Sequence, residues 1–280
     1  NKQGKTYRKT PDQLQDLNVD FVPSSELKSG DYVLEYIDDT EVEISEIDEQ
    51  MAFLIGVYTA EGYCQEDFVE FCFGENDQLI KKTIDILQSR FSGKITEIPR
   101  PERSGHYVRC FDKNLVNFCY KHARTGAHNK KLSMQILQLP KKLQKVFLGA
   151  YLDGDGCTIR HRINNDGHSN GKGSMQASSA SIQLLNGIRI ICLRLRCPAT
   201  LSSHNRIASA STVMDQTTEY VEHMLYITNT ISSILNDFSN KAFENEKSIK
   251  PKYDSFFYKQ YIAHRIKDIT VIDNNEPTYY

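Results

Sequence analysis

The sequence has no apolar run that approaches the roughly 20 residues needed to cross a lipid bilayer. Its first residues, Asn1 to Lys5, lack the apolar stretch of a secretory signal peptide. We therefore expect no membrane partner and an intracellular location. Hydrophobic residues make up 39% of the 280 positions and charged residues 25%, a balance typical of globular proteins. This length allows one large domain or two ordinary ones.

Cysteine occurs without the spacing of a metal site or a disulfide framework. The seven cysteines include no Cys-x-x-Cys pair, and their number is odd. Most have apolar neighbours, as Cys72 has in Phe71 and Phe73, so we interpret them as reduced core residues. The sequence also lacks a Gly-x-Ser-x-Gly motif and a P-loop, which argues against serine hydrolases and P-loop nucleotide hydrolases.

The formal net charge of −2 gives no overall sign of a nucleic-acid partner. The distribution of charge is less even. Basic residues gather at 100–131, 160–162 and 189–196, and acidic residues gather at 38–49. Each cluster alone is typical of a solvated surface, so charge by itself does not identify a partner.

One unusual string occurs twice. Residues 53–62 read FLIGVYTAEG and residues 147–156 read FLGAYLDGDG. Each is an apolar helical segment that ends in an acid followed by Gly, and the two acids are Glu61 and Asp155. Two copies indicate a duplicated fold unit in which one carboxylate from each half reaches a shared site.

Hydrophobic periodicity predicts the same order of elements after each copy. After the first copy we predict strands at 68–73, 94–98 and 107–111 and helices at 77–91 and 114–122. After the second copy we predict strands at 157–163, 174–179, 199–203 and 220–228 and helices at 181–196 and 230–238. The predicted fold class is mixed α/β (α+β), with two pseudo-symmetric αββαββα halves at 46–140 and 141–250.

The ends of the chain have a different character. Residues 1–45 contain short strands and turns, and residues 251–280 include a strand-like run from Ile266 to Ile272. We predict that these two pieces pair in a small β-rich domain into which the middle of the chain is inserted.

Small residues recur four positions apart in each copy of the string. They are Gly56 and Ala60 in the first copy and Ala150 and Gly154 in the second. Because positions i and i+4 share a helix face, each helix presents a strip almost without side chains. Two such strips allow two helix backbones to approach closely.

Such packing would bring Glu61 and Asp155 together at the C-terminal ends of their helices. A carboxylate is disfavoured there by about 0.3–1 kcal/mol, and each acid raises the pKa of the other. A divalent cation relieves both costs. Carboxylates, the carbonyls of Ala60 and Gly154, and water are ligands that suit Mg²⁺. The sequence therefore predicts metal-assisted phosphoryl hydrolysis.

The two strings resemble the paired signature helices of LAGLIDADG homing endonucleases, most of all the variety carried inside inteins. Residues 130–133, KKLS, are similar to the intein-endonuclease block that contains a catalytic lysine, with Ser133 where Pro is common. The resemblance covers about residues 48–240. It implies sheets that form a saddle over double-stranded DNA, Mg²⁺-dependent cleavage of both strands with short 3′ overhangs, and a monomer that contains both halves.

The resemblance also implies roles for individual residues. Glu61 and Asp155 would be metal ligands, and Lys130, with Lys131 as the alternative, would polarise water or stabilise charge on the phosphate. No lysine stands between Arg196 and Lys241, so the matching lysine of the second half is not placed. The candidates for DNA contacts are Arg103, Arg109, Arg160, Arg162, Arg189 and Lys131.

Both flanks resemble parts of an intein (Hint-like) splicing domain. Gln13 stands where the splicing histidine is expected, and Asn1 is not a Cys or Ser nucleophile. We therefore expect that this chain does not splice, and host-protein exteins would be partners only of an intact intein. The alternatives are a DNA-binding protein that has lost cleavage, an intein whose main activity is protein splicing, and an RNA-splicing maturase.

Overall fold

The computed structural model describes residues 19–75, 77–159, 173–207, 219–241 and 255–270. The chain divides into two compact units, one of residues 1–38 with 249–280 and one of residues 39–248. No helix among the described residues has both the length and the apolar character to traverse a bilayer.

The larger unit contains the same order of elements twice. The first half has α1 (Glu49–Glu61), β2 (Gly62–Cys64), β3 (Val69–Gly74), α2 (Leu79–Arg90), β4 (Lys94–Arg100), the 3₁₀ turn η3 (Pro101–Arg103), β5 (Gly105–Phe111), α3 (Lys113–Ala123) and α4 (Met134–Leu137). The second half has α5 (Lys141–Asp155), β6 (Gly156–Thr158), β7 (Met175–Ser179), α6 (Ile182–Arg194), β8 (Ala199–Ile207), β9 (Glu219–Ile227) and α7 (Thr230–Ile234).

The two sheets have the same antiparallel topology. Their strand orders are β2-β3-β5-β4 and β6-β7-β9-β8, so the second sheet repeats the first strand for strand. The predicted fold class of two pseudo-symmetric α/β halves is therefore confirmed.

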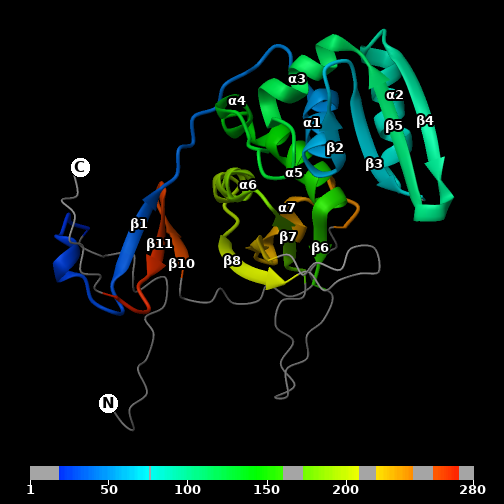
Figure 1. The fold of residues 1–280 in the computed structure, drawn as a ribbon. Helices are drawn as coiled ribbons and strands as arrows, with labels where there is room; N and C mark the ends of the chain where they lie inside the picture. The colour runs from blue at the N-terminus through cyan, green and yellow to red at the C-terminus, as the bar shows by residue number, and fades with distance from the viewer. Residues whose placement is uncertain (1–18, 76, 160–172, 208–218, 242–254, 271–280) are drawn as a thin grey trace. The chain divides into compact units, whose positions relative to one another are not determined.

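Helices α1 and α5 lie side by side between the two sheets (Figure 1). A Cβ on Gly56 would stand 2.4 Å from the Phe147 carbonyl oxygen and 2.9 Å from the Cβ of Ala150. A Cβ on Gly154 would stand 2.6 Å from that of Ala60. The strips of small residues therefore face each other, as the i, i+4 spacing predicts, and they allow a backbone separation that larger side chains would prevent.

The inner face of each sheet packs on helices. In β3 the side chains of Val69, Phe71 and Phe73 are buried, and Cys72 between them is only half-buried. The interpretation of Cys72 as a core residue is therefore wrong, because alternation along a strand sends it to the opposite face. Cys157 is exposed, the other five cysteines are buried, and all seven are free thiols.

Several predicted boundaries differ from the structure. The strands β2 and β6 follow the motif helices directly and have three residues each. The strand expected at 157–163 is β6, which ends at Thr158. Ile159 lies outside the strand, and residues 160–163 lie outside the described ranges. Helix α7 ends at Ile234, earlier than expected.

The smaller unit contains a three-stranded antiparallel sheet of order β1-β11-β10. Its strands are β1 (Tyr32–Tyr36), β10 (Ser255–Tyr258) and β11 (Tyr261–Arg265), and β1 from the N-terminal segment pairs directly with β11 from the C-terminal segment. A strand predicted to start at Ile266 is wrong over the described residues. Strand β11 ends at Arg265, and Ile266 exchanges backbone hydrogen bonds with Gly30 and Asp31, which directly precede β1.

Candidate active site

Each motif helix ends in its acid and passes without a loop into a strand. Glu61 is the last residue of α1 and Asp155 the last of α5, and the next residues, Gly62 and Gly156, begin β2 and β6. A Cβ on Gly62 would stand 2.5 Å from the Tyr58 carbonyl oxygen. The glycine after each acid is therefore required by the sharp change from helix to strand, which fixes where each carboxyl group leaves the backbone.

The close packing of α1 and α5 brings the two acids together. A Cβ on Gly154, the neighbour of Asp155, would lie 3.1 Å from Oε1 of Glu61. Burial, and after it the charge of Asp155, raise the pKa of Glu61 to about 7. Desolvation by the surrounding residues also raises the pKa of Asp155 to about 6, although the residue itself is exposed to solvent. Two carboxyl groups are thus held where their ionised forms are poorly compensated.

Lys130 lies at the C-terminal end of α1. Its Nζ donates to the carbonyls of Tyr58 at 3.2 Å, Thr59 at 2.8 Å and Ala60 at 3.4 Å. Burial lowers its pKa, and the charges of Asp155 and Glu61 oppose that shift. Lys131 is exposed. Of the two lysines left open by the sequence, Lys130 is therefore the one at the helix ends.

Lys241 occupies the corresponding place at the end of α5. Its Nζ donates to the carbonyls of Gly154 at 3.0 Å and Gly156 at 2.7 Å, and its charge lowers the pKa of both Glu61 and Asp155. Sequence reasoning left the second-half lysine unplaced. The available signal was its position after the helix that follows the last strand of its half, because Lys130 likewise comes after α3, the helix that follows β5.

The donor set fits an oxygen-liganded cation such as Mg²⁺. Glu61 and Asp155 carry raised pKa values that a nearby cation would reverse. The carbonyls of Ala60 and Gly154 already accept from lysine, so each has one lone pair left for a second partner. Among the described residues no group of three or more His, Cys, Asp and Glu side chains could hold a metal. A centre here would therefore need water ligands, which Mg²⁺ usually keeps.

The basic residues predicted to contact DNA are dispersed. Arg109 on β5 donates to Glu70 on β3 and lies 5.0 Å from the ring centre of Phe68. Arg103 ends the turn η3. Arg189 lies on helix α6 rather than on a strand, so base reading from a strand does not apply to it. Arg160 and Arg162 lie outside the described residues.

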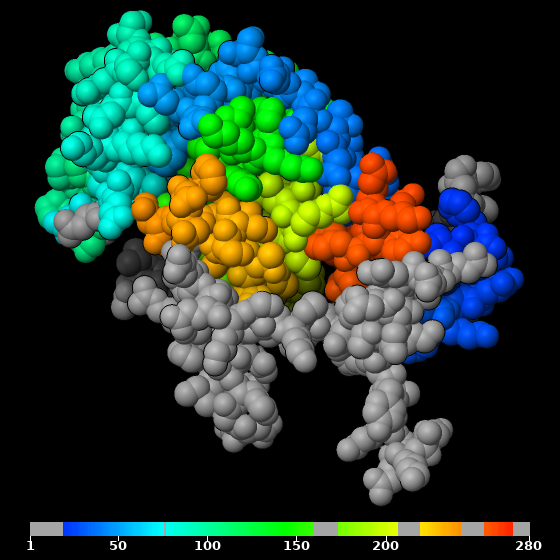
Figure 2. Space-filling model, turned by 180° about the vertical axis from the view of Figure 1, so that it is seen from behind, coloured from blue at the N-terminus to red at the C-terminus, as the bar shows by residue number. Residues whose placement is uncertain are grey.

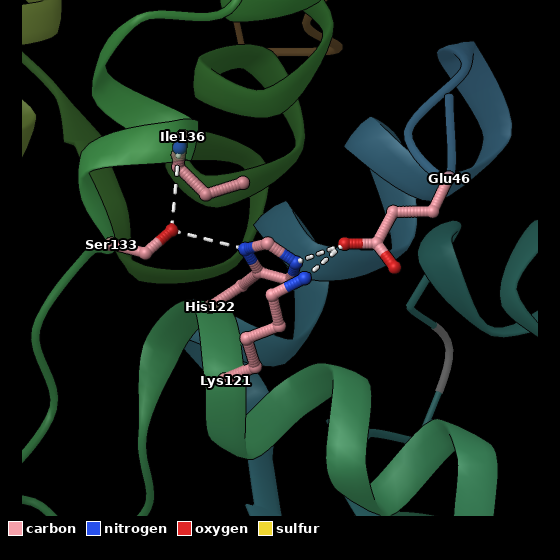
Figure 3. A network of polar contacts seen from close by, with 5 residues as sticks. All are labelled: Glu46, Lys121, His122, Ser133 and Ile136. Carbon is pink, nitrogen blue, oxygen red and sulfur yellow. Dashed lines mark hydrogen bonds and ion pairs between the residues drawn. The ribbon is translucent and has the colours of Figure 1, made fainter. Parts of the chain in front are cut away.

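A buried histidine on α3 holds the segment that follows Lys130 (Figure 3). His122 is fully buried on α3, with Nε2 3.1 Å from Glu46 and Nδ1 3.0 Å from the Ser133 hydroxyl. The backbone amide of Ser133 donates to the His122 carbonyl at 2.9 Å. A proline at position 133, common in the resembling block, could not make this bond. The His122 network therefore fixes the segment on the C-terminal side of Lys130.

Comparisons with known proteins give distant matches. No protein-family model matches the chain. An uncharacterized protein of Methanocaldococcus jannaschii, MJ0043, is 28% identical over 165 residues, which are 57% of this chain and 18% of that protein. The chain thus spans less than a fifth of this relative's length.

Solved structures of I-DmoI are similar to this chain. Its complex with DNA and Mn covers 69% of this chain and 97% of that one, with a TM-score of 0.44 and 10% identity. Its complex with DNA and Ca covers 69% and 91%, with a TM-score of 0.46 and 10% identity. Mesophilic variants of the homing endonuclease I-DmoI cover 68% and 94%, with a TM-score of 0.44 and 12% identity.

Proposed function

We propose that this chain is a site-specific DNA endonuclease of the LAGLIDADG homing endonuclease type. In this proposal it makes Mg²⁺-dependent double-strand breaks with short 3′ overhangs. The observation that carries it is the meeting of two acids, Glu61 and Asp155, with Lys130 and Lys241 at the common end of two packed helices, where both lysines lower the pKa of both acids. One acid and one lysine from each half suit a substrate with two equivalent strands.

The chemistry divides between a cation and the side chains. A divalent cation, when bound, supplies an activated water and charge for the leaving oxygen. Glu61 and Asp155 would hold it from the two helix ends. Lys130 and Lys241 place positive charge beside the same point, where it would stabilise the phosphate in the transition state. Their ammonium groups are fixed by backbone carbonyls, so they need no rearrangement as the charge develops.

The sheets would bind the duplex on the face away from the helices. Arg109 is held there by Glu70 and Phe68, and a guanidinium fixed in this way can recognise guanine in the major groove. Because both halves belong to one chain, we infer that the monomer is the active form. We also infer, from the flank resemblance and from Gln13 in the place of the splicing histidine, that the endonuclease derives from an intein with impaired splicing. Expression between two reporter proteins tests this inference, and a ligated product would contradict it.

Selection from a randomised duplex library tests the proposed function. With Mg²⁺ we expect cleavage at one long target site. With Ca²⁺ we expect binding of the same site with little cleavage. Glu61→Gln and Asp155→Asn should each reduce cleavage at least 1,000-fold and leave DNA binding within a few fold of the original protein. Asp85→Asn, which makes the same kind of change on the exposed face of α2, is the matched control.

The result decides between the proposal and its main alternative. If the unmodified protein binds a target and does not cut it with Mg²⁺ or Mn²⁺, it is a DNA-binding protein on this fold. If Glu61→Gln or Asp155→Asn cuts both strands at the original rate, the assignment of the acids is wrong.

A further inference from the structure

Asp153 lies in the last turn of α5, and its carboxylate is fully committed to the segment that carries Lys241. The residue is 9% exposed. Oδ1 accepts from the Ser239 hydroxyl at 2.6 Å and from the Lys241 amide at 3.1 Å, and Oδ2 accepts from the Asn240 amide at 3.0 Å. Both oxygens are engaged by donors on three consecutive residues, so this acid holds backbone and does not reach the candidate metal position.

The same face of α5 is shaped for this segment. Gly149 stands one turn before Asp153, and a Cβ there would lie 2.0 Å from the Phe238 carbonyl oxygen. Figure 2 shows the orange atoms of residues 219–241 beside green atoms from the middle of the chain. This face is distinct from the one that Ala150 and Gly154 present to α1. Helix α5 therefore has one bare strip for its partner helix and a second close contact for the lysine segment.

These contacts determine where the Lys241 side chain starts. Asp153 fixes its amide, and the Thr158 hydroxyl donates to its carbonyl at 3.0 Å. From this backbone position the ammonium reaches the carbonyls of Gly154 and Gly156. The long lysine side chain is thus anchored at both of its ends.

The first half uses a different support. Thr59 stands where Asp153 stands in the second string, and its hydroxyl donates within α1 to the Ile55 carbonyl at 2.6 Å. Lys130 is fixed instead by two backbone hydrogen bonds. Its amide donates to the Gly126 carbonyl at 3.1 Å, and its carbonyl accepts from the Ser181 hydroxyl at 2.6 Å. A change at residue 153 therefore removes the support of one lysine and leaves the other intact.

We propose that Asp153 is the positioning residue of Lys241 and thereby controls cleavage of one DNA strand and not of the other. This inference rests on the proposed nuclease function. It adds that the two active centres, although related by pseudo-symmetry, depend on unlike supports and can be disabled separately.

The test is strand-resolved cleavage of a supercoiled plasmid that carries the selected target. Asp153→Ala should slow one strand at least tenfold, leave the other within about twofold, and accumulate nicked circles. Lys241→Met should slow the same strand, and Lys130→Met the opposite one. Asp237→Asn removes an exposed acid next to the segment and should change neither rate.

Strand asymmetry separates positioning from simple stabilisation, because a smaller folded fraction slows both strands equally. Ser239→Ala removes only one of the three donors and should show a weaker slowing of the same strand, which keeps the test decisive if Asp153→Ala folds poorly. Equal slowing of both strands, or slowing of the strand that depends on Lys130, would overturn the proposal.

A second measurement needs no DNA. Brief acetylation followed by mass spectrometry reports how firmly each lysine is held, and in Asp153→Ala we expect Lys241 to be labelled at least threefold faster with Lys130 unchanged. Unchanged labelling of Lys241 overturns the positioning role whatever the cleavage data show. If the unmodified protein cuts no DNA, the proposed function fails, and the labelling still decides whether Asp153 positions Lys241.

Discussion

The ammonium group of Lys241 donates to the Gly154 carbonyl at 3.0 Å, directly before the acid that ends α5. Lys130 makes the equivalent contact with the Ala60 carbonyl at 3.4 Å, directly before the acid that ends α1. Each positive charge lies at the negative end of a helix dipole, where it is favoured. The lysines therefore offset part of the cost of placing Glu61 and Asp155 at the same ends.

The contact between Gly56 and α5 gives a prediction about stability. Gly56→Val would force a branched side chain against the Phe147 carbonyl, which a Cβ alone would approach to 2.4 Å. We expect a loss of about 2 kcal/mol or more in the free energy of unfolding, measured by urea titration. Gly74→Val is the control, because a Cβ there meets nothing within 4 Å. Equal losses in the two variants would show that α1 and α5 are not in close contact.

The raised pKa values of the two acids give a pH dependence with a definite sign. In the folded state Glu61 has a pKa of about 7 and Asp155 a pKa of about 6. Between the usual carboxyl pKa and these values, the folded protein keeps protons that the unfolded chain has released. Without metal their contribution to stability therefore falls as the pH rises from about 4 to about 7.

Two variants isolate this contribution. Glu61→Gln and Asp155→Asn should each raise the free energy of unfolding at pH 8, in EDTA, by about 1 kcal/mol, after allowance for solvent screening. Mg²⁺ should raise the Tm of the unmodified protein more at pH 8 than at pH 5, and it should do so less in either variant. If the difference in the free energy of unfolding between the unmodified protein and Glu61→Gln were the same at pH 4 and pH 8, the raised pKa of Glu61 would be contradicted.

The His122 network gives a dependence of opposite sign. Burial lowers the pKa of His122 despite the nearby Glu46, so the ring is neutral in the folded state when the unfolded chain becomes protonated. Its contribution is fully present above about pH 6.5 and is lost as the pH falls through the lower folded pKa. His122→Gln should remove this acid sensitivity, measured as the pH dependence of urea unfolding. Ser133→Ala should cost about 1 kcal/mol through the lost cap of α4, with the acid sensitivity retained.

What the sequence could predict here was set by local repetition. The spacing of Gly56 and Ala60, and of Ala150 and Gly154, was enough to predict the helix contact, because a helix converts sequence spacing directly into a face. The duplicated string in turn predicted the two halves and the proximity of Glu61 and Asp155.

The remaining details depend on contacts between distant segments. Lys241 and Asp153 are 88 positions apart, and nothing in either local pattern indicates that they meet. Strands β2 and β6, with three residues each, are too short to show a period of two. For Cys72 the signal was present, since alternation with Phe71 and Phe73 places it on the outer face, and its apolar neighbours in sequence were misleading.

The hydroxyl of Ser181, which caps α6, donates to the carbonyl of Lys130 at 2.6 Å. The second half thus completes the first half's centre, and exchange of whole halves between related chains would separate donor from acceptor unless the incoming half also brought a hydroxyl to that position. A chimaera joined at residue 140 would therefore keep each half's fold and lose a hydrogen bond that holds the backbone of Lys130.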